Sequence, residues 1–175
     1  FTIDNTLTGS IDGEGGADIL DIGVSGEDIT VTAAGTSGVD GTVSASISSG
    51  FSDIDDLRAT VGTNILTGDD AASIWTLDGT PDYEVGGQTA AFEGFETLQG
   101  GSNTDAFSVT AATALALKGG GGVDTFTIDD TLTGSIDGEA GVDILDIGVS
   151  GENITVTAAG TSGVDGNVSA SITSG

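Results

Sequence analysis

The 175-residue chain contains no cysteine, no histidine and no methionine, and its only basic residues are Arg58 and Lys118. Without cysteine, no disulfide can hold the fold and no thiolate can act as a nucleophile or metal ligand. Without histidine, the commonest general base is missing. The chain offers few sites for oxidation or for trypsin-like proteases, which favours a protein exposed outside the cell.

The shortage of basic residues gives the chain a strongly acidic balance. It carries 28 Asp and Glu residues against two Lys and Arg, a formal net charge of −26. Nucleic acids need Lys and Arg to neutralise their phosphates, so we expect no nucleic-acid partner. Anionic membrane surfaces are disfavoured for the same reason, and no apolar run is long enough for membrane insertion. An acidic chain of this kind attracts cations or basic partners, or is simply well hydrated.

The most informative feature is a long internal repeat. Residues 1–50 recur at 126–175, so that 1–125 forms one full repeat unit and 126–175 the start of a second, near-identical one. Only six of the fifty paired positions differ: Asn5/Asp130, Gly15/Ala140, Ala17/Val142, Asp28/Asn153, Thr42/Asn167 and Ser48/Thr173. Near-identical copies are typical of extended repetitive polymers. A catalytic site needs one distinctive constellation, so we predict that the chain is not an enzyme and is a slice of a longer array.

A shorter spacing lies inside the repeat. The chain has 31 glycines and one proline, no helical apolar stripe, and many short runs in which apolar and small or polar residues alternate. The bulky residues Leu98, Phe107, Leu117, Phe126 and Ile136 follow one another at steps of nine and ten. This spacing predicts an all-β fold, a parallel β-solenoid (β-helix) with coils of about 19 residues, whose apolar residues stack in interior rows.

Two segments, 33–58 and 78–98, do not follow this spacing, and we expect a larger coil, a third strand face or a surface loop there. The aromatic residues in or near the second segment are predicted to fill its core: Trp75, Tyr83, Phe92 and Phe95. The competing fold is a series of β-sandwich domains, one per 125 residues, because such domains also show short strands with frequent turns. A strict 19-residue spacing is not expected of a sandwich, and it favours the solenoid.

Glycine–aspartate turns carry the most specific motif. Residues 119–127 fit the nonapeptide G-G-x-G-x-D-x-U-x in full, and residues 100–108 and 138–146 fit it with one change each. Residues 13–21 repeat the last of these, and a faint copy at 68–75 has Ser73 in place of the aspartate. Glycines allow sharp turns, and the aspartate sits where each turn ends.

Stacked turns would place the aspartates in one row, where like charges repel unless a cation neutralises them. Ca²⁺ is the usual hard cation for carboxylates and turn carbonyls. The candidate ligands are Asp105, Asp124, Asp143 and Asp18, with turn backbone at Gly100, Gly119, Gly121 and Gly138. The alternative is that glycine and aspartate simply make good turns, with the aspartate capping backbone amides.

The nonapeptide turns resemble the RTX family of secreted Ca²⁺-binding β-rolls, although the match covers three or four turns on one side only. The wider chain, in phrases such as residues 64–77 and 92–101, is similar to the repetitive β-solenoid surface proteins of bacteria, including filamentous-haemagglutinin-like adhesins. The resemblance implies a structural segment of a long, stiff, acidic surface fibre or adhesin, extracellular and on the bacterial cell surface. The alternative is a Ca²⁺-dependent, RTX-like secreted adhesin or S-layer module.

The expected partners are further copies of the chain, through tandem repeats or end-to-end stacking. A third hypothesis is an adhesin that contacts a cell-surface receptor or glycan through residues 78–98. Clusters of acids at residues 53–56 and 69–70 could suggest glycoside hydrolysis. They lack a basic or sugar-binding aromatic neighbourhood, so we interpret them as solvated turn residues.

Overall fold

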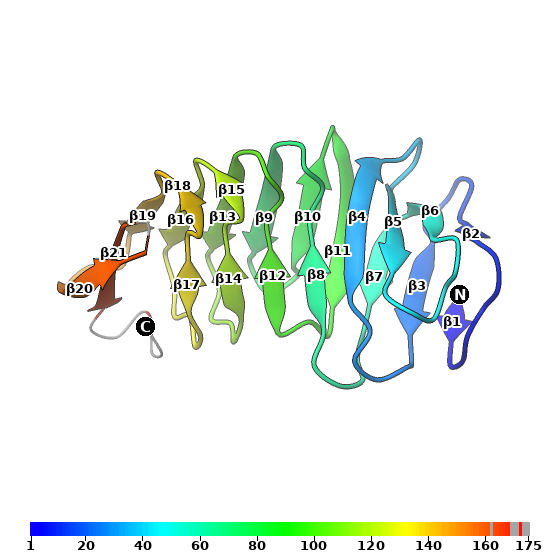
Figure 1. The fold of residues 1–175 in the computed structure, drawn as a ribbon, viewed down its shortest axis with the longest axis horizontal. Coiled ribbons are helices and arrows are strands. Elements are labelled where there is room, and N and C mark those ends of the chain that lie inside the picture. Colours follow the sequence, from blue (N-terminus) through cyan, green and yellow to red (C-terminus); the bar gives the residue numbers. More distant parts are fainter. Residues whose placement is uncertain (162, 169–171, 173–175) are drawn as a thin grey trace.

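The structure is a computed structural model that describes residues 1–161, 163–168 and 172. The described residues form β-strands and no helix, so the all-β prediction is confirmed. Figure 1 shows an elongated molecule whose strands cross its long axis. No described segment forms a helix of the length and apolarity needed to span a membrane.

Two large sheets make up most of the molecule, and both are mostly parallel. The nine-stranded sheet has the order β1 (Thr2–Ile3), β3 (Ile19–Ile22), β7 (Asp56–Arg58), β11 (Gln88–Glu93), β10 (Asp82–Val85), β9 (Ser73–Leu77), β13 (Asp105–Val109), β16 (Thr125–Ile128), β19 (Ile144–Ile147). The eight-stranded sheet has the order β17 (Ile136–Asp137), β14 (Ala116–Lys118), β12 (Thr97–Gln99), β8 (Ile65–Thr67), β4 (Ile29–Ala34), β5 (Val39–Val43), β6 (Phe51–Ile54), β2 (Ile11–Asp12). Two small two-stranded sheets complete the fold: parallel β15 (Gly121–Gly122) with β18 (Ala140–Gly141), and antiparallel β20 (Ile154–Gly160) with β21 (Gly163–Val168).

From β12 to β19 the chain passes back and forth between the two large sheets. In the eight-stranded sheet Leu117 pairs with Leu98 on one side and with Ile136 on the other. In the nine-stranded sheet Phe126 lies between Phe107 and Leu145 in the same way. Each pair is 19 residues apart, so the pairing register follows the spacing predicted from the sequence.

The two irregular segments depart from the parallel pattern as expected, but their form was not foreseen. Each adds antiparallel strands to one of the two sheets: β4–β5–β6 in the eight-stranded sheet and β9–β10–β11 in the nine-stranded one. The hairpin between β10 and β11 turns at Gly86 and Gly87, with φ values of 58° and 83°. A two-residue hairpin turn with positive φ at both positions favours glycine.

The interior of the rod is a continuous apolar row. Trp75, Phe107 and Phe126 lie on neighbouring strands and stack nearly parallel, with centroids 5.4 Å and then 4.9 Å apart and planes at 7° and 11°. Tyr83 packs on the other side of the Trp75 ring at 4.4 Å. The aromatic residues predicted to fill the core are all buried there: Trp75, Tyr83, Phe92 and Phe95.

Where both copies of the repeated sequence are described, their strands pair in the same register. Ile3 pairs with Ile22 in the first copy, and Ile128 pairs with Ile147 in the second. The β4–β5 hairpin has the same register and bulge position as the β20–β21 hairpin. Equivalent strands lie seven positions apart in both large sheets, as the pairs β1/β16, β3/β19 and β2/β17 show. Both sheets therefore advance by the same number of strands in one 125-residue unit.

Candidate functional site

Three of the four predicted aspartates form one row along the nine-stranded sheet. The backbone amide of Asp105 donates to Oδ1 of Asp124 over 2.8 Å, and the amide of Asp124 donates to Oδ1 of Asp143 over 3.1 Å. The residues are 19 positions apart, and the carboxylates of Asp124 and Asp143 each cap the amide of the aspartate 19 residues earlier. We call Asp105, Asp124 and Asp143 the aspartate row.

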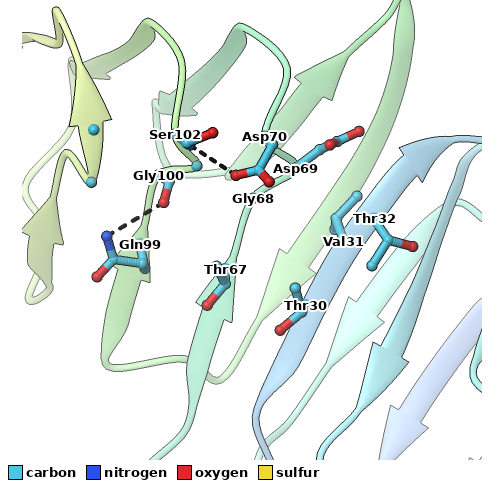
Figure 2. Close-up of a pocket in the computed structure, with 13 residues that line it drawn as sticks. Thr30, Val31, Thr32, Thr67, Gly68, Asp69, Asp70, Gln99, Gly100 and Ser102 are labelled. Atoms are coloured by element: carbon cyan, nitrogen blue, oxygen red, sulfur yellow. Dashed lines mark hydrogen bonds between the residues drawn. The ribbon is translucent and has the colours of Figure 1, made fainter.

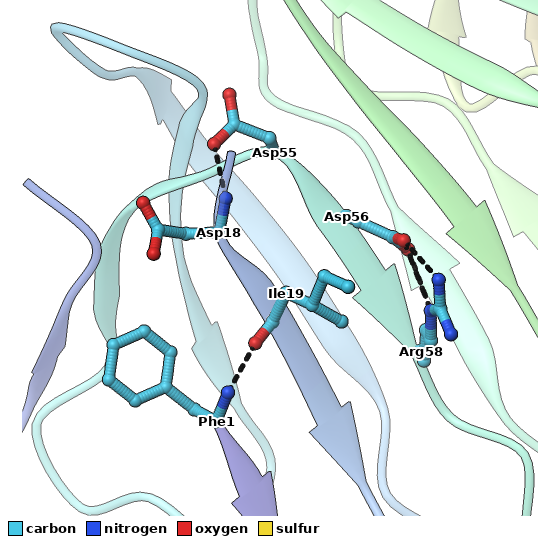
Figure 3. Close-up of polar contacts among 6 residues, drawn as sticks. All are labelled: Phe1, Asp18, Ile19, Asp55, Asp56 and Arg58. Carbon is cyan, nitrogen blue, oxygen red and sulfur yellow. Dashed lines mark hydrogen bonds and ion pairs between the residues drawn. The ribbon is translucent and has the colours of Figure 1, made fainter. Parts of the chain in front are cut away.

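Asp18 lies elsewhere, near the opposite end of the same sheet. Its backbone amide donates to Oδ2 of Asp55 over 2.9 Å (Figure 3). Asp55 caps the Asp18 amide in the same way that Asp124 caps the Asp105 amide. No glycine motif precedes Asp55. The sequence correctly indicated Asp18 as an equivalent of Asp143, but it did not indicate Asp55 as the residue that caps it.

The glycines of the motif make room for the carboxylates. A Cβ placed on Gly119 would overlap Oδ2 of Asp124 and the carbonyl oxygen of Gly138. Similar overlaps with an aspartate five residues further on occur at Gly100 and Gly138. This close packing explains why the first glycine and the aspartate recur with fixed spacing. Gly121 differs, because the nearest atom to its Cβ would be 3.6 Å away, in Ser102.

Asp105 ends the row and is fully buried. Its Oδ1 accepts a hydrogen bond from the Ser73 hydroxyl over 2.5 Å, and its Oδ2 accepts one from the Gly101 amide over 2.9 Å. Ser73 occupies the place where the faint motif lacks its aspartate. Burial raises the pKa of Asp105 to about 6, against the lowering effect of these hydrogen bonds and with a smaller raising effect from Asp124.

Asp124 in the middle of the row is fully buried as well. Its Oδ1 accepts the Asp105 amide, while its Oδ2 has no hydrogen-bond partner among the described residues. Burial raises the pKa of Asp124, and the charges of Asp143 and Glu139 add to this effect. Protonation of the Asp124 carboxyl, or binding of a cation to it, would remove the unfavourable burial of its negative charge.

The aspartate row has only some of the features of a Ca²⁺ site. Ca²⁺ takes six to eight oxygen ligands. Both oxygens of Asp105 already accept hydrogen bonds, and within the described part of the chain no three acidic side chains gather closely enough to hold a metal ion. Oδ2 of Asp124 is a buried acceptor of the row that has no hydrogen-bond partner among the described residues, so a cation could bind there. The contacts favour amide capping as the first role of these aspartates.

The acid cluster at residues 53–56 is also structural, and its interpretation as solvated turn residues is wrong. These side chains are half-buried. Oδ1 of Asp53 accepts the amides of Thr36 and Ser37, and Asp56 forms an ion pair with Arg58 at 2.5 Å (Figure 3). The cluster joins the first copy of the repeat to the segment that follows it.

An open hollow of about 410 Å³ lies beside the glycine turns (Figure 2). Threonine, glycine and acidic residues line most of it, and no Lys or Arg does. Oδ1 of Asp70 accepts the Ser102 amide over 3.0 Å, and the Gln99 side-chain amide donates to the Gly100 carbonyl over 3.3 Å. These polar groups therefore bond to one another in the wall of the hollow.

Sequence reasoning missed two buried polar residues. The carboxylate of Glu27 accepts hydrogen bonds from the Ser44 hydroxyl and from the amides of Ala45 and Ser46. Burial opposes its ionisation, but these hydrogen bonds outweigh burial and lower its pKa. Asn64 is fully buried and its side-chain amide donates to three backbone carbonyl oxygens. Neither residue belongs to the glycine–aspartate motif, so its burial was not predicted from the sequence.

Comparisons of the chain with protein-family models, with curated proteins and with solved structures find no match in any of the three. The class of protein is accordingly defined by the fold: an all-β chain of two mostly parallel sheets, in which the described strands of a repeated sequence pair in the same register.

Proposed function

We propose that the chain is a segment of a parallel β-solenoid made of tandem 125-residue units, and that it forms part of a long, stiff fibre or adhesin on the outside of a bacterial cell. One observation carries the proposal: equivalent strands of the two copies lie seven positions apart in both large sheets. Equal advance of both sheets lets one unit follow another without a change of structure.

Stiffness would come from the two continuous sheets and from the interior row of apolar and aromatic residues. The net charge of −26 would keep neighbouring fibres hydrated and apart. The proposal assigns the chain no catalytic reaction. The acids that most resemble a catalytic pair are used to cap backbone amides or to bind Arg58, which supports a structural role.

The receptor-binding hypothesis receives less support. Under this hypothesis residues 78–98 bind the receptor or glycan, and deleting them should abolish attachment while leaving the rod intact. They supply β10 and β11, which lie inside the nine-stranded sheet with Tyr83 and Phe92 buried. Deleting this segment would break the sheet and could not spare the rod.

The test of the fibre is the length of tandem arrays in electron micrographs. Chains of two, four and eight 125-residue units should appear as straight rods. Each added unit should lengthen the rod by seven strand spacings, about 34 Å. A string of separate globules whose spacing varies from particle to particle would contradict the proposal.

A second candidate function is a Ca²⁺-dependent secreted module, an RTX-like adhesin or S-layer segment. The observation in its favour is the buried Oδ2 of Asp124, which has no hydrogen-bond partner among the described residues. A cation there would neutralise a carboxyl that burial and neighbouring acids disfavour in its charged form. Its test is the response of the fold to a chelator, described below.

A further inference from the structure

The two copies of the repeat differ in what covers them. Three pairs of equivalent residues are fully buried in the first copy and exposed in the second: Leu20 and Leu145 at 0% and 39%, Ile29 and Ile154 at 0% and 59%, Val39 and Val164 at 0% and 70%. Ile19 and Ile144 serve as an internal reference, since they are exposed to a similar degree, at 42% and 51%. Only certain side chains of the second copy have lost a neighbour.

The missing neighbour can be identified because the first copy retains it. Residues 51–67, which follow the first copy in the chain, lie against all three buried side chains. The pairs across this contact are Leu20 with Leu57, Ile29 with Leu66 and Val39 with Ile54. The apolar face of the repeated sequence is therefore shaped for residues 51–67.

Polar contacts fix the register of the same interface (Figure 3). The Asp18 amide donates to the Asp55 carboxylate, and the Asp18 carbonyl accepts the amides of Asp55 and Asp56 over 3.0 and 3.1 Å. A second contact joins the Ile65 amide to the side-chain oxygen of Asp28 over 2.9 Å. These contacts are directional, so a slip of one residue would break them.

The six differences between the copies leave this face intact. Four of the first-copy residues concerned have exposed side chains, so their replacement leaves the buried apolar contacts unchanged: Asn5, Ala17, Thr42 and Ser48. A Cβ on Gly15 would meet nothing within 4 Å, so Ala140 fits in its place. Asp28 becomes Asn153, which keeps the side-chain oxygen that accepts the Ile65 amide.

We propose that the open face formed by β19, β20 and β21 is the docking surface for a second copy of residues 51–67. In this contact Leu57 of the second copy lies against Leu145, Leu66 against Ile154 and Ile54 against Val164. Asp55 of that copy caps the Asp143 amide and thereby extends the aspartate row. The inference rests on the proposed function and names the contact that completes the unit beginning at Phe126, as residues 51–67 complete the first unit.

The docking segment must be a copy of residues 51–67 that no other residues already cover. In a separate 175-residue chain these residues are covered by residues 1–50 of that chain. A copy of residues 51–125 that follows residue 175 directly has no such cover, because no further residues 1–50 precede it. Covalent connection also keeps the segment at high effective concentration near the open face.

The test extends the full 175-residue chain by a further copy of residues 51–125 and follows hydrogen exchange at Leu145. The amides of Ile144 and Gly148 donate toward β16, so those of Leu145 and Ile147, which alternate with them, face the open edge. The Leu145 amide should exchange at least tenfold more slowly in the extended chain. The Ala17/Val142 difference allows mass spectrometry to separate peptides of the two copies.

The control is the same extension with Leu57→Asp and Leu66→Asp in the added copy, for which Leu145 should exchange as in the 175-residue chain. Equal exchange at Leu145 with and without the unaltered extension would overturn the inference. Rod-shaped tandem arrays without protection of the Leu145 amide would support the fibre and contradict this contact. Protection at Leu145 in arrays that do not form rods would support this contact and contradict the fibre.

Discussion

The rings of Phe107 and Phe126, which are 19 residues apart in the chain, stack with centroids 4.9 Å apart and planes 11° apart. Trp75 continues the stack beyond Phe107, and Leu145 takes the next place after Phe126. Both phenylalanines are almost completely buried. One row of side chains thus links four neighbouring strands of the nine-stranded sheet.

Phe107→Ala should be strongly destabilising, because it removes the middle ring of this stack and leaves a cavity between Trp75 and Phe126. Losses for such substitutions are about 3–5 kcal/mol. Urea denaturation followed by Trp75 fluorescence measures the change. Thr110→Ala, at an exposed position one residue beyond β13, is the matched control and should change stability by less than about 0.5 kcal/mol. Similar losses for both variants would show that the stack contributes little.

Gly119→Ala should destabilise the fold by about 1–3 kcal/mol, because the added methyl group overlaps the Asp124 carboxylate and the Gly138 carbonyl oxygen. Gly15→Ala is the control, since its methyl group meets open space and the second copy already carries Ala140 there. Thermal unfolding of both variants checks the prediction. Equal melting temperatures would mean that the turn relaxes and that its glycine is not required for packing.

The fold should become more stable as the pH falls from about 7 toward 4. The pKa of Asp105 is about 6 when folded and 3.8 when unfolded, so between these values the folded chain binds more protons than the unfolded chain. The difference is worth at most about 3 kcal/mol.

Asp105→Asn removes this titration, so its unfolding free energy should depend less on pH than that of the parent chain. Urea denaturation at several pH values between 4 and 7 measures both curves. The repulsion among the other acids is common to the two chains and cancels in the comparison. Parallel curves would mean that Asp105 is ionised in the folded chain at all these pH values.

Removal of Ca²⁺ by a chelator should leave the far-ultraviolet circular dichroism and the melting temperature unchanged. The reason is that carboxylates of the aspartate row accept hydrogen bonds from the protein itself. Collapse of the spectrum on chelation would favour the Ca²⁺-dependent module instead. In that case calorimetry should detect saturable Ca²⁺ binding that Asp124→Asn weakens, and Asp69→Asn, at the surface hollow, should leave binding unchanged.

The sequence was sufficient to predict the all-β class and the pairing of Leu98 with Leu117 and of Phe107 with Phe126. Strands that stack in parallel place equivalent residues above one another, so the stacking distance appears directly as a spacing in the sequence. The glycine–aspartate motif was also informative, because close packing of Gly119 on Asp124 requires both residues at fixed separation.

The sequence did not reveal where the carboxylates point or which amides they cap. Asp55 caps an amide 37 residues away, and Glu27 accepts amides 18 and 19 residues away. Such distances depend on how the two sheets come together and leave no local pattern. The antiparallel strands of the two irregular segments were missed for a related reason, since alternation of apolar residues is the same in parallel and antiparallel strands.

The equal advance of the two sheets has a mechanical consequence. If one sheet gained more strands per unit than the other, the molecule would bend, and the curvature would accumulate until a growing assembly closed or broke. Seven strands on each side remove this source of mismatch. In the fibre that we propose, the length would then be set by the number of copies encoded in its gene.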